Sequence, residues 1–275
     1  MKSYKTTIIE PKKGWQLIDW QEIKEYKDLL YFLVMRDVKA IYKQTVLGIG
    51  WAVIRPIVTM IVFTVIFGKL AKVPSDGIPY PIFSYSALLP WLYFQNSITK
   101  SSQILITNAP MLSKIYFPRI FFPFVPVLAG LIDFVLSFIV LLLLMLGYGM
   151  IPTLKILWVF PLIILMMLFS TGLGLWFSSM GVYYRDVRHA NQFLGRMLMY
   201  MAPVVWPVSL IPDQYRLIYG LYPMGGVIEG FRAAIVGVNP MPWDLIGVGF
   251  ASAVIIFVSG LFIFKRMEKV FADVA

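Results

Sequence analysis

The residues of this chain that could do chemistry are few and far apart. Glu229 and Arg232 are three residues apart, so on a helix they would share a face and could pair. Asp133 lies within a long apolar stretch, where a carboxylate is costly and is a functional candidate by default. A lone histidine, His189, cannot build a metal site, and a chain without cysteine has no disulfide or thiolate chemistry. No nucleophile–base pair is visible, so catalytic and metal-binding roles have little support.

The sequence also has no phosphate-binding loop of the GxxxxGK[ST] type. Gly68-Lys69 lacks both the upstream glycine and the hydroxyl residue that should follow the lysine. We therefore expect no ATP hydrolysis by this chain, and no cofactor bound to it.

The composition is that of a membrane protein. Hydrophobic residues make up 59% of the chain and charged residues 14%, which is far less charge than soluble domains carry. The net charge of +10 does not require nucleic acid as a partner, because Lys and Arg collect beside anionic lipid on the cytoplasmic side of membranes. The polar, lysine-rich start, residues 1–27, does not resemble a cleavable signal peptide and is expected to be a cytosolic extension.

Apolar stretches long enough to cross a hydrocarbon layer of about 30 Å follow residue 50. The spans expected as helices are 51–68, 84–106, 120–147, 156–180, 193–211 and 245–264. Within the fourth, Gly172 and Gly174 should allow close contact between helices. The predicted fold is thus an all-α membrane protein, with a membrane domain over residues 49–275.

Residues 28–48 precede the first span and are too charged to cross. At 100° per residue, Asp28, Arg36, Lys39 and Lys43 share one arc and apolar residues lie opposite. This pattern favours an amphipathic helix along the cytoplasmic interface. A soluble helix packed on a partner is the alternative.

The segment 217–238 is ambiguous, because it is long enough to cross but is broken by Tyr222-Pro223-Met224-Gly225-Gly226. It is either a seventh span or a re-entrant pair of short helices within 212–238. With six spans, nineteen Lys and Arg lie inside and five outside, together the 24 of the chain. This bias favours six spans, a re-entrant pair and two cytosolic termini.

Three features have a structural and a functional interpretation. Asp133 either satisfies polar groups of a neighbouring helix or subunit, which we favour, or relays protons. The two short inner loops, a polar one over 107–119 and a charged one over 183–189, either fix the topology or dock an external motor. The aromatic residues near the membrane ends either form the usual interface belt or stack on sugar rings in a channel mouth. These aromatic residues are Trp91, Tyr93, Phe94, Trp206, Tyr215, Tyr219 and Tyr222.

An ordered set of short motifs over nearly the whole chain resembles the permeases of polysaccharide-export ABC transporters, which serve O-antigen, capsule and teichoic acid export. The motifs are Arg36-Asp37-Val38-Lys39, Tyr42-Lys43-Gln44-Thr45-Val46-Leu47-Gly48, Trp51, Arg55-Pro56, Leu88-Leu89-Pro90-Trp91 with Phe94, Lys114 with Phe117-Pro118-Arg119, Tyr183-Tyr184-Arg185-Asp186-Val187 and Tyr222-Pro223-Met224.

The resemblance implies a six-helix permease in the bacterial cytoplasmic (inner) membrane that works as a homodimer. Two separate ATPase subunits would bind ATP and Mg, and a lipid-linked glycan would be the substrate. The coupling residues toward the ATPase would be Asn108, Met111, Lys114, Tyr184, Arg185 and Asp186. The outer gate would contain Pro212, Tyr215, Tyr222, Pro223, Glu229 and Arg232. We expect the channel lining to include Arg55, Trp91, Tyr93, Phe94 and Trp206.

Two other transport functions stay open. A related ABC permease for a small drug or haem would have a similar fold and a narrower lumen. An ion- or proton-coupled flippase would use Asp133, although a single acid and no visible internal repeat argue against it. A membrane-embedded enzyme is the remotest alternative.

Overall fold

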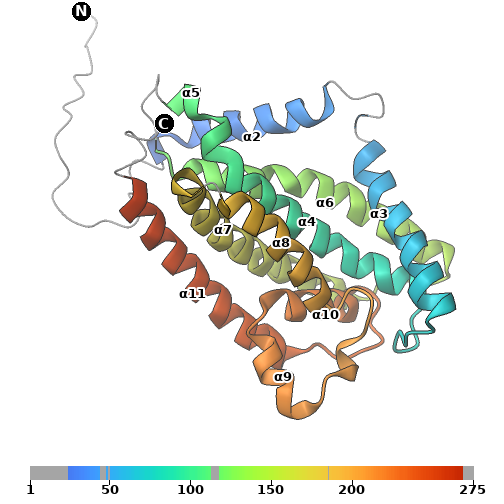
Figure 1. The fold of residues 1–275 in the computed structure, drawn as a ribbon. Coiled ribbons are helices and arrows are strands. Elements are labelled where there is room, and N and C mark those ends of the chain that lie inside the picture. Colours follow the sequence, from blue (N-terminus) through green and yellow to red (C-terminus); the bar gives the residue numbers. More distant parts are fainter. Residues whose placement is uncertain (1–23, 44–47, 49, 113–117, 185, 269–275) are drawn as a thin grey trace, which may run out of the picture.

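The computed structural model describes residues 24–43, 48, 50–112, 118–184 and 186–268, and within these ranges the structure is helical without strands (Figure 1). The helices are α2 (Lys27–Tyr42), α3 (Gly50–Phe63), η1 (Thr64–Leu70), α4 (Tyr80–Thr107), α5 (Ala109–Leu112), α6 (Phe121–Gly147), η2 (Leu154–Trp158), α7 (Val159–Tyr183), α8 (Asp186–Met201), η3 (Val208–Leu210), α9 (Asp213–Gly220), α10 (Pro223–Ile235) and α11 (Trp243–Glu268).

Four helical stretches of the described chain are long and apolar enough to cross a membrane. They are Gly50–Leu70, Phe121–Gly147, Leu154–Tyr183 and Trp243–Glu268. The first continues from α3 into the π-helix η1 without a break, and the third joins η2 to α7. The predicted first, fourth and sixth spans each fall within one of these stretches, and the third coincides with Phe121–Gly147 to within one residue. The protein is therefore a multi-pass membrane protein.

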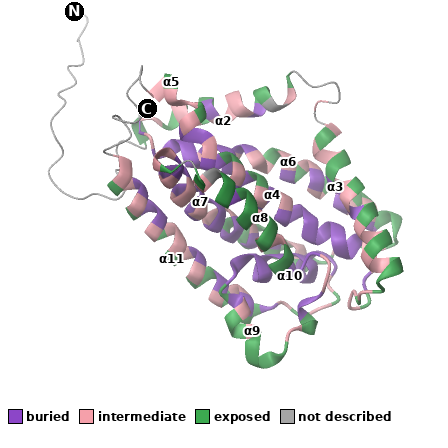
Figure 2. Cartoon of the chain, viewed as in Figure 1, coloured by how far each residue is buried: buried purple, intermediate pink, exposed green. Residues whose placement is uncertain are grey.

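The predicted second span corresponds to α4, a helix of 28 residues at the centre of the protein. It packs against α3, α6, α7, α8 and α10 and is buried along most of its length (Figure 2). It is less apolar than the other long helices because it contains five serines as well as Gln95, Asn96, Lys100 and Gln103. Several of the serine hydroxyls bond to backbone carbonyls, such as Ser101 Oγ to Pro123 O at 3.1 Å.

Glycines allow α7 to approach its neighbours closely, as predicted from the sequence. A Cβ placed on Gly172 would lie 2.9 Å from backbone atoms of Phe257 in α11, and one on Gly174 would lie 2.9 Å from Ser101 Cβ in α4. No side chain fits at either distance. The two glycines therefore set the spacing of α7 from α11 on one side and from α4 on the other.

The start of α2 and the end of α11 lie at the same end of the bundle. Leu29 and Met267 both pack on an apolar cluster that includes Leu105, Phe122 and Phe264. Arg119, between α5 and α6, also donates a hydrogen bond of 3.1 Å to the carbonyl of Glu268.

The prediction of a helical fifth span over 193–211 is wrong, and so is that of a charged loop over 183–189. The helix α8 occupies Asp186–Met201 instead, so most of that supposed loop begins a helix. Pro203 and Pro207, which have no backbone N–H to donate to a helix, lie in the non-helical segment after Met201. With 16 residues α8 is about 24 Å long, shorter than the hydrocarbon layer.

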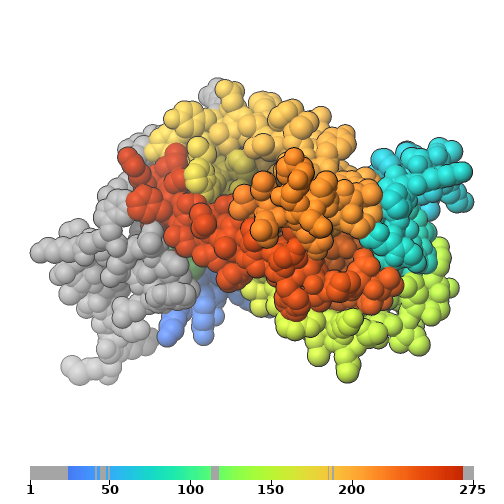
Figure 3. All heavy atoms as spheres, turned by 90° about the horizontal axis from the view of Figure 1, so that it is seen from below, coloured from blue at the N-terminus to red at the C-terminus, as the bar shows by residue number. Residues whose placement is uncertain are grey.

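The ambiguous segment before the last span contains two short helices, α9 and α10, separated at Leu221 and Tyr222. Pro223 opens α10, where a proline at the first helical position is well tolerated. Every residue of α10 is buried, whereas α9 is largely exposed. Figure 3 looks onto this end of the molecule, where the α9 region lies foremost beside α11.

Candidate functional site

Two predicted coupling residues are held by a side chain from α2. A guanidinium nitrogen of Arg36 donates to Asn108 Oδ1 at 2.9 Å, and the other lies 3.7 Å from Met111 Sδ. The neighbouring Asp37 accepts a third bond of 3.0 Å from Arg36. Asn108 ends α4 because its side-chain amide donates back to the carbonyl of Ile104 at 2.8 Å. The α4–α5 turn is therefore tied to α2.

The second predicted coupling segment lies at the same end of the bundle. Tyr184 is non-helical and 61% exposed, and Asp186 is the exposed first residue of α8. Val182, near the end of α7, and Met111 of α5 pack on the same apolar cluster. Lys114 and Arg185 lie outside the described residues. The four coupling residues that are described thus gather at one end, where a partner could contact them together.

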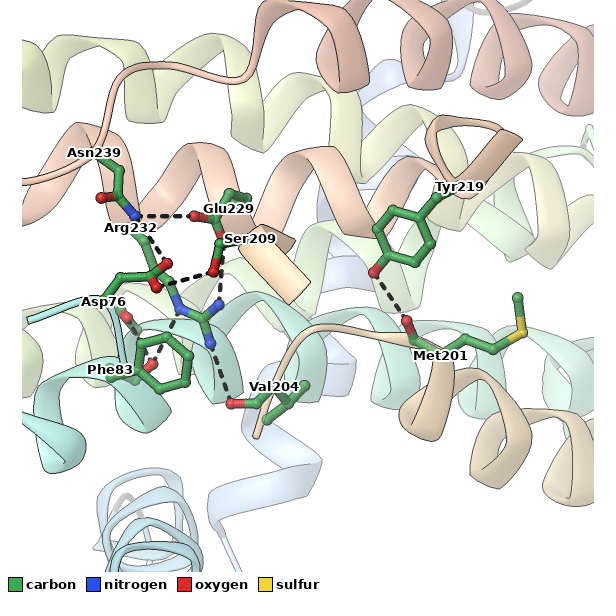
Figure 4. A network of polar contacts seen from close by, with 10 residues as sticks. Asp76, Phe83, Met201, Val204, Ser209, Tyr219, Glu229, Arg232 and Asn239 are labelled. Atoms are coloured by element: carbon green, nitrogen blue, oxygen red, sulfur yellow. Dashed lines mark hydrogen bonds and ion pairs between the residues drawn. The ribbon is translucent and has the colours of Figure 1, made fainter. Parts of the chain in front are cut away.

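The predicted pair of Glu229 and Arg232 forms at the opposite end, inside a buried polar cluster. An Arg232 nitrogen lies 3.2 Å from Glu229 Oε2, and the guanidinium carbon lies 3.5 Å from the centre of the Phe83 ring. Arg232 also donates to the carbonyls of Phe83 at 3.3 Å and Val204 at 3.2 Å. One side chain of α10 therefore links α4, the segment after α8 and its own helix (Figure 4).

Other polar residues complete this group, which we call the gate cluster: Asp76, Ser209, Glu229, Arg232 and Asn239. Asp76 accepts from Ser209 Oγ at 2.9 Å and from Asn239 Nδ2 at 3.4 Å, and Asn239 also donates to Glu229 at 3.4 Å (Figure 4). The cluster thus joins α10 to three connecting segments. Complete burial lowers the pKa of Arg232, and the carboxylate of Glu229 opposes that shift.

The segment of α9 and α10, predicted to contain the gate, is also hydrogen-bonded to α8. Tyr219 of α9 donates to the carbonyl of Met201 at 2.9 Å, and Tyr222 donates to that of Leu198 at 3.2 Å. Beside them lies an open, mostly apolar pocket of about 640 Å³, and Trp206, Tyr215, Tyr222 and Pro223 of the predicted sites line it. Pro212, at the start of α9, is exposed. The predicted gate residues therefore lie on connected elements at one end.

The residues predicted to line a channel do not lie together. Trp91 and Phe94 are buried in the core, where Phe94 stacks on Phe169 with ring centres 5.0 Å apart. These two do not face an open space within one copy of the chain, because α4 is surrounded by other helices. Tyr93 donates to the carbonyl of Val127 at 2.7 Å and, with Arg55, lines a different cavity.

The sequence analysis missed several polar partners. Asp76, Ser209 and Asn239 come from connecting segments, and no spacing in the sequence links them to Arg232. Asp133 accepts a hydrogen bond from the Tyr42 hydroxyl, which agrees with the structural interpretation of this acid. Partial burial and the neighbouring carboxylate raise the pKa of Tyr42.

Residues 28–236, from α2 to the end of α10, match the model of a family described as ABC-2 type transporter. The chain belongs to the ABC-2 type transporter family. It is 30% identical over 249 residues to the O-antigen export system permease protein RfbA of Klebsiella pneumoniae, covering 90% of this chain and 95% of that protein. It is 29% identical over 258 residues to the protein of the same name from Myxococcus xanthus, covering 92% and 97%.

A more distant relative of this ABC-2 type transporter is the polysialic acid transport protein KpsM of Escherichia coli. The two are 23% identical over 212 residues, which is 74% of this chain and 80% of the relative. The family match contains both ends described above, the turn held by Arg36 and the gate cluster up to Arg232.

Proposed function

We propose that this ABC-2 type transporter is the membrane subunit of an ATP-driven exporter for a lipid-linked polysaccharide of the O-antigen or capsule type. Two copies would form the channel, and two separate ATPase subunits would bind ATP and Mg. The named functions of the relatives support the substrate class.

The position of α4 carries this proposal. At its carboxyl end Asn108 accepts a hydrogen bond from Arg36, and near its amino end the Phe83 carbonyl accepts one from Arg232. A helix of 28 residues is about 42 Å long, so α4 would transmit movement of one end to the other. The helix therefore connects a surface suited to docking with a latched cluster suited to gating.

ATP binding would then close the two ATPase subunits and shift the α4–α5 turn and the α7–α8 junction. The work comes from the difference in affinity of the partner for two states of the permease, as any population shift requires. Movement of α4 would strain the contacts of Arg232 to Phe83 and Val204 and release α9 and α10. The aromatic pocket beside them would contact sugar rings as the gate opens.

Six crossings with both termini in the cytosol fit this mechanism. We assign them to α3 with η1, α4, α6, η2 with α7, α8 with the segment that follows it, and α11. The helix α2 would lie along the cytoplasmic surface of the inner membrane, and α9 with α10 would form the re-entrant outer gate.

Reconstitution of the chain with its ATPase tests the proposal. ATP turnover should rise severalfold when the lipid-linked glycan is added, and deletion of the gene should remove the surface polysaccharide. Drug sensitivity with intact polysaccharide would instead indicate a small-molecule permease. Transport that survives loss of the ATPase but fails in Asp133→Asn would indicate an ion-coupled flippase.

A further inference from the structure

A cavity of about 450 Å³ lies between α3, α4 and α6, and the last residue of α2 covers part of it. Its ionisable lining consists of Tyr42 from α2, Arg55 from α3, Tyr93 and Lys100 from α4, and Asp133 from α6. This cavity shares no lining residue with the aromatic pocket or the gate cluster. It is therefore a separate feature of the protomer.

The two cations of the cavity are available to a ligand, whereas the acid is engaged. Asp133 accepts the hydrogen bond of Tyr42. Arg55 and Lys100 form no ion pair or side-chain hydrogen bond with any other residue that the structure describes, and both side chains reach an exposed surface. The cavity thus has a net positive charge with two free donors.

Neutral donors lie beside the cations. Asn96 is one helical turn before Lys100 on α4 and also lines the cavity. Ser97 is fully buried, and its hydroxyl has no hydrogen-bond partner in the described part of the chain. An arginine, a lysine and uncharged donors around one space are a set suited to a phosphate group with several acceptor oxygens.

The depth of the cavity and its apolar border favour a phosphate that belongs to a lipid. Lys100 is seven residues before the end of α4 and so lies about 10 Å from the end of the bundle that carries α5. Arg55 lies farther from that end, because Ala52, one turn before it in α3, accepts a hydrogen bond from Ser137, which is sixteen residues into α6. The neighbouring face of α3 exposes Trp51, Ile54 and Val58, which could contact acyl chains. A soluble anion would gain nothing from that face.

We propose that this cavity binds the phosphate headgroup of a lipid, with Arg55 and Lys100 holding the phosphate oxygens. Asn96 and Ser97 supply further donors, and the hydrogen bond to Tyr42 keeps Asp133 turned to α2. The lipid is either a phospholipid of the membrane or the phosphate-bearing anchor of an exported glycan. The site itself is independent of transport.

Binding to the purified full-length chain in neutral detergent tests this site. Dihexanoyl phosphatidylglycerol, dihexanoylglycerol and inorganic phosphate are each tested as competitors of a bound fluorescent phosphatidylglycerol. The double variant Arg55→Gln/Lys100→Gln should weaken binding of the phospholipid at least tenfold. Lys155→Gln, which removes one exposed positive charge outside the cavity, should leave it within twofold.

The variant Asp133→Asn should change the affinity for phosphatidylglycerol in the opposite direction to the double variant. It removes a negative charge beside the phosphate but keeps an oxygen that accepts from Tyr42, so it should bind phosphatidylglycerol severalfold more tightly. Misfolding would weaken binding in both variants and cannot produce this pattern. Equal binding by the double variant and the parent, or weaker binding by Asp133→Asn, overturns the proposal.

Two further arms identify the ligand. Displacement by dihexanoylglycerol, or by inorganic phosphate as effectively as by phosphatidylglycerol, overturns the assignment to a phosphate-bearing lipid. A polyprenyl diphosphate that competes more strongly than phosphatidylglycerol identifies the anchor of a glycan as the source, and the reverse order identifies a membrane phospholipid. Either order upholds the site, and no arm depends on the export assay.

Discussion

Among the charged residues that the structure describes, Arg232 is the one whose side chain is fully enclosed by protein. A buried guanidinium is tolerated only where its charge and its donors are all matched. Here Glu229 supplies the charge, two carbonyls accept hydrogen bonds and the Phe83 ring covers one face. Its value to the protein is positional, because those partners belong to separate segments that one side chain holds together.

Arg232→Met should therefore destabilise the folded chain by about 3–5 kcal/mol, since it leaves Glu229 buried without its counter-ion. Thermal unfolding of the purified protein in detergent, followed by tryptophan fluorescence, measures the loss. The double variant Glu229→Gln/Arg232→Met should recover much of it, because no unpaired charge remains. A double variant less stable than Arg232→Met would contradict this account of the cluster.

Arg36→Gln should reduce ATP-driven export severalfold while the complex with the ATPase still assembles. The shorter neutral side chain cannot hold Asn108 and Met111 as Arg36 does, so the α4–α5 turn would move independently of α2. Transport assays with co-purification of the ATPase measure both properties. Lys39→Gln removes the same charge from an exposed position of α2 and should transport normally.

Among individual residues, the sequence was informative only where partners are neighbours along a helix. The spacing of Glu229 and Arg232 predicted their pairing, which the structure confirms. The contacts of Arg232 to Phe83 and Val204 join residues 149 and 28 positions apart, and no local pattern encodes them. Trp91 was assigned to a channel because aromatic composition does not distinguish a buried ring from an exposed one.

The close contact of α7 with α11 at Gly172 predicts that a glycine-to-alanine change there has the opposite effect on stability to the usual one. Replacing a helical glycine with alanine usually stabilises by about 1 kcal/mol. Gly172→Ala should instead destabilise the protein, by about 1–3 kcal/mol, because the new methyl group would meet the backbone of Phe257.

Gly247→Ala is the matched control, since a Cβ at Gly247 in α11 meets no atom within 4 Å. Thermal unfolding should show a lower midpoint for Gly172→Ala and an unchanged or higher midpoint for Gly247→Ala. Equal shifts would mean that the close approach of α7 to α11 contributes nothing to stability.

Hydropathy predicted the bounds of helices that are apolar on all faces. It gave wrong bounds for a helix that has a polar first half and is followed by prolines. The long helices α6, α7 and α11 were expected within a few residues of their ends. The helix α8 was placed too late, because its first half is polar and its carboxyl end is set by the segment containing Pro203 and Pro207. The pattern of apolar residues therefore predicts helices that face lipid better than helices whose polar groups bond to other helices.

For the whole molecule, the arrangement of α2 and α11 at one end predicts which surfaces reagents reach. The chain has no cysteine, so single cysteines can be introduced without removing native thiols. In intact cells, a membrane-impermeant maleimide should label Asp213→Cys at the start of α9 and should leave Asp28→Cys and Arg266→Cys unlabelled. All three positions are exposed, and permeabilised cells should label all three variants. Labelling of only one of Asp28→Cys and Arg266→Cys in intact cells would place the two ends on opposite sides.

The long separation between Phe83 and Arg232 also orders the biogenesis of the protein. A growing chain that has inserted α4 and α8 has already made the carbonyls of Phe83 and Val204, but their shared donor is translated only later. Until α10 is synthesised, these segments lack the side chain that joins them, and contacts so distant along the chain form late. A chain that stops before residue 232 would therefore insert its early helices but leave the end that carries the gate cluster unassembled and open to proteases.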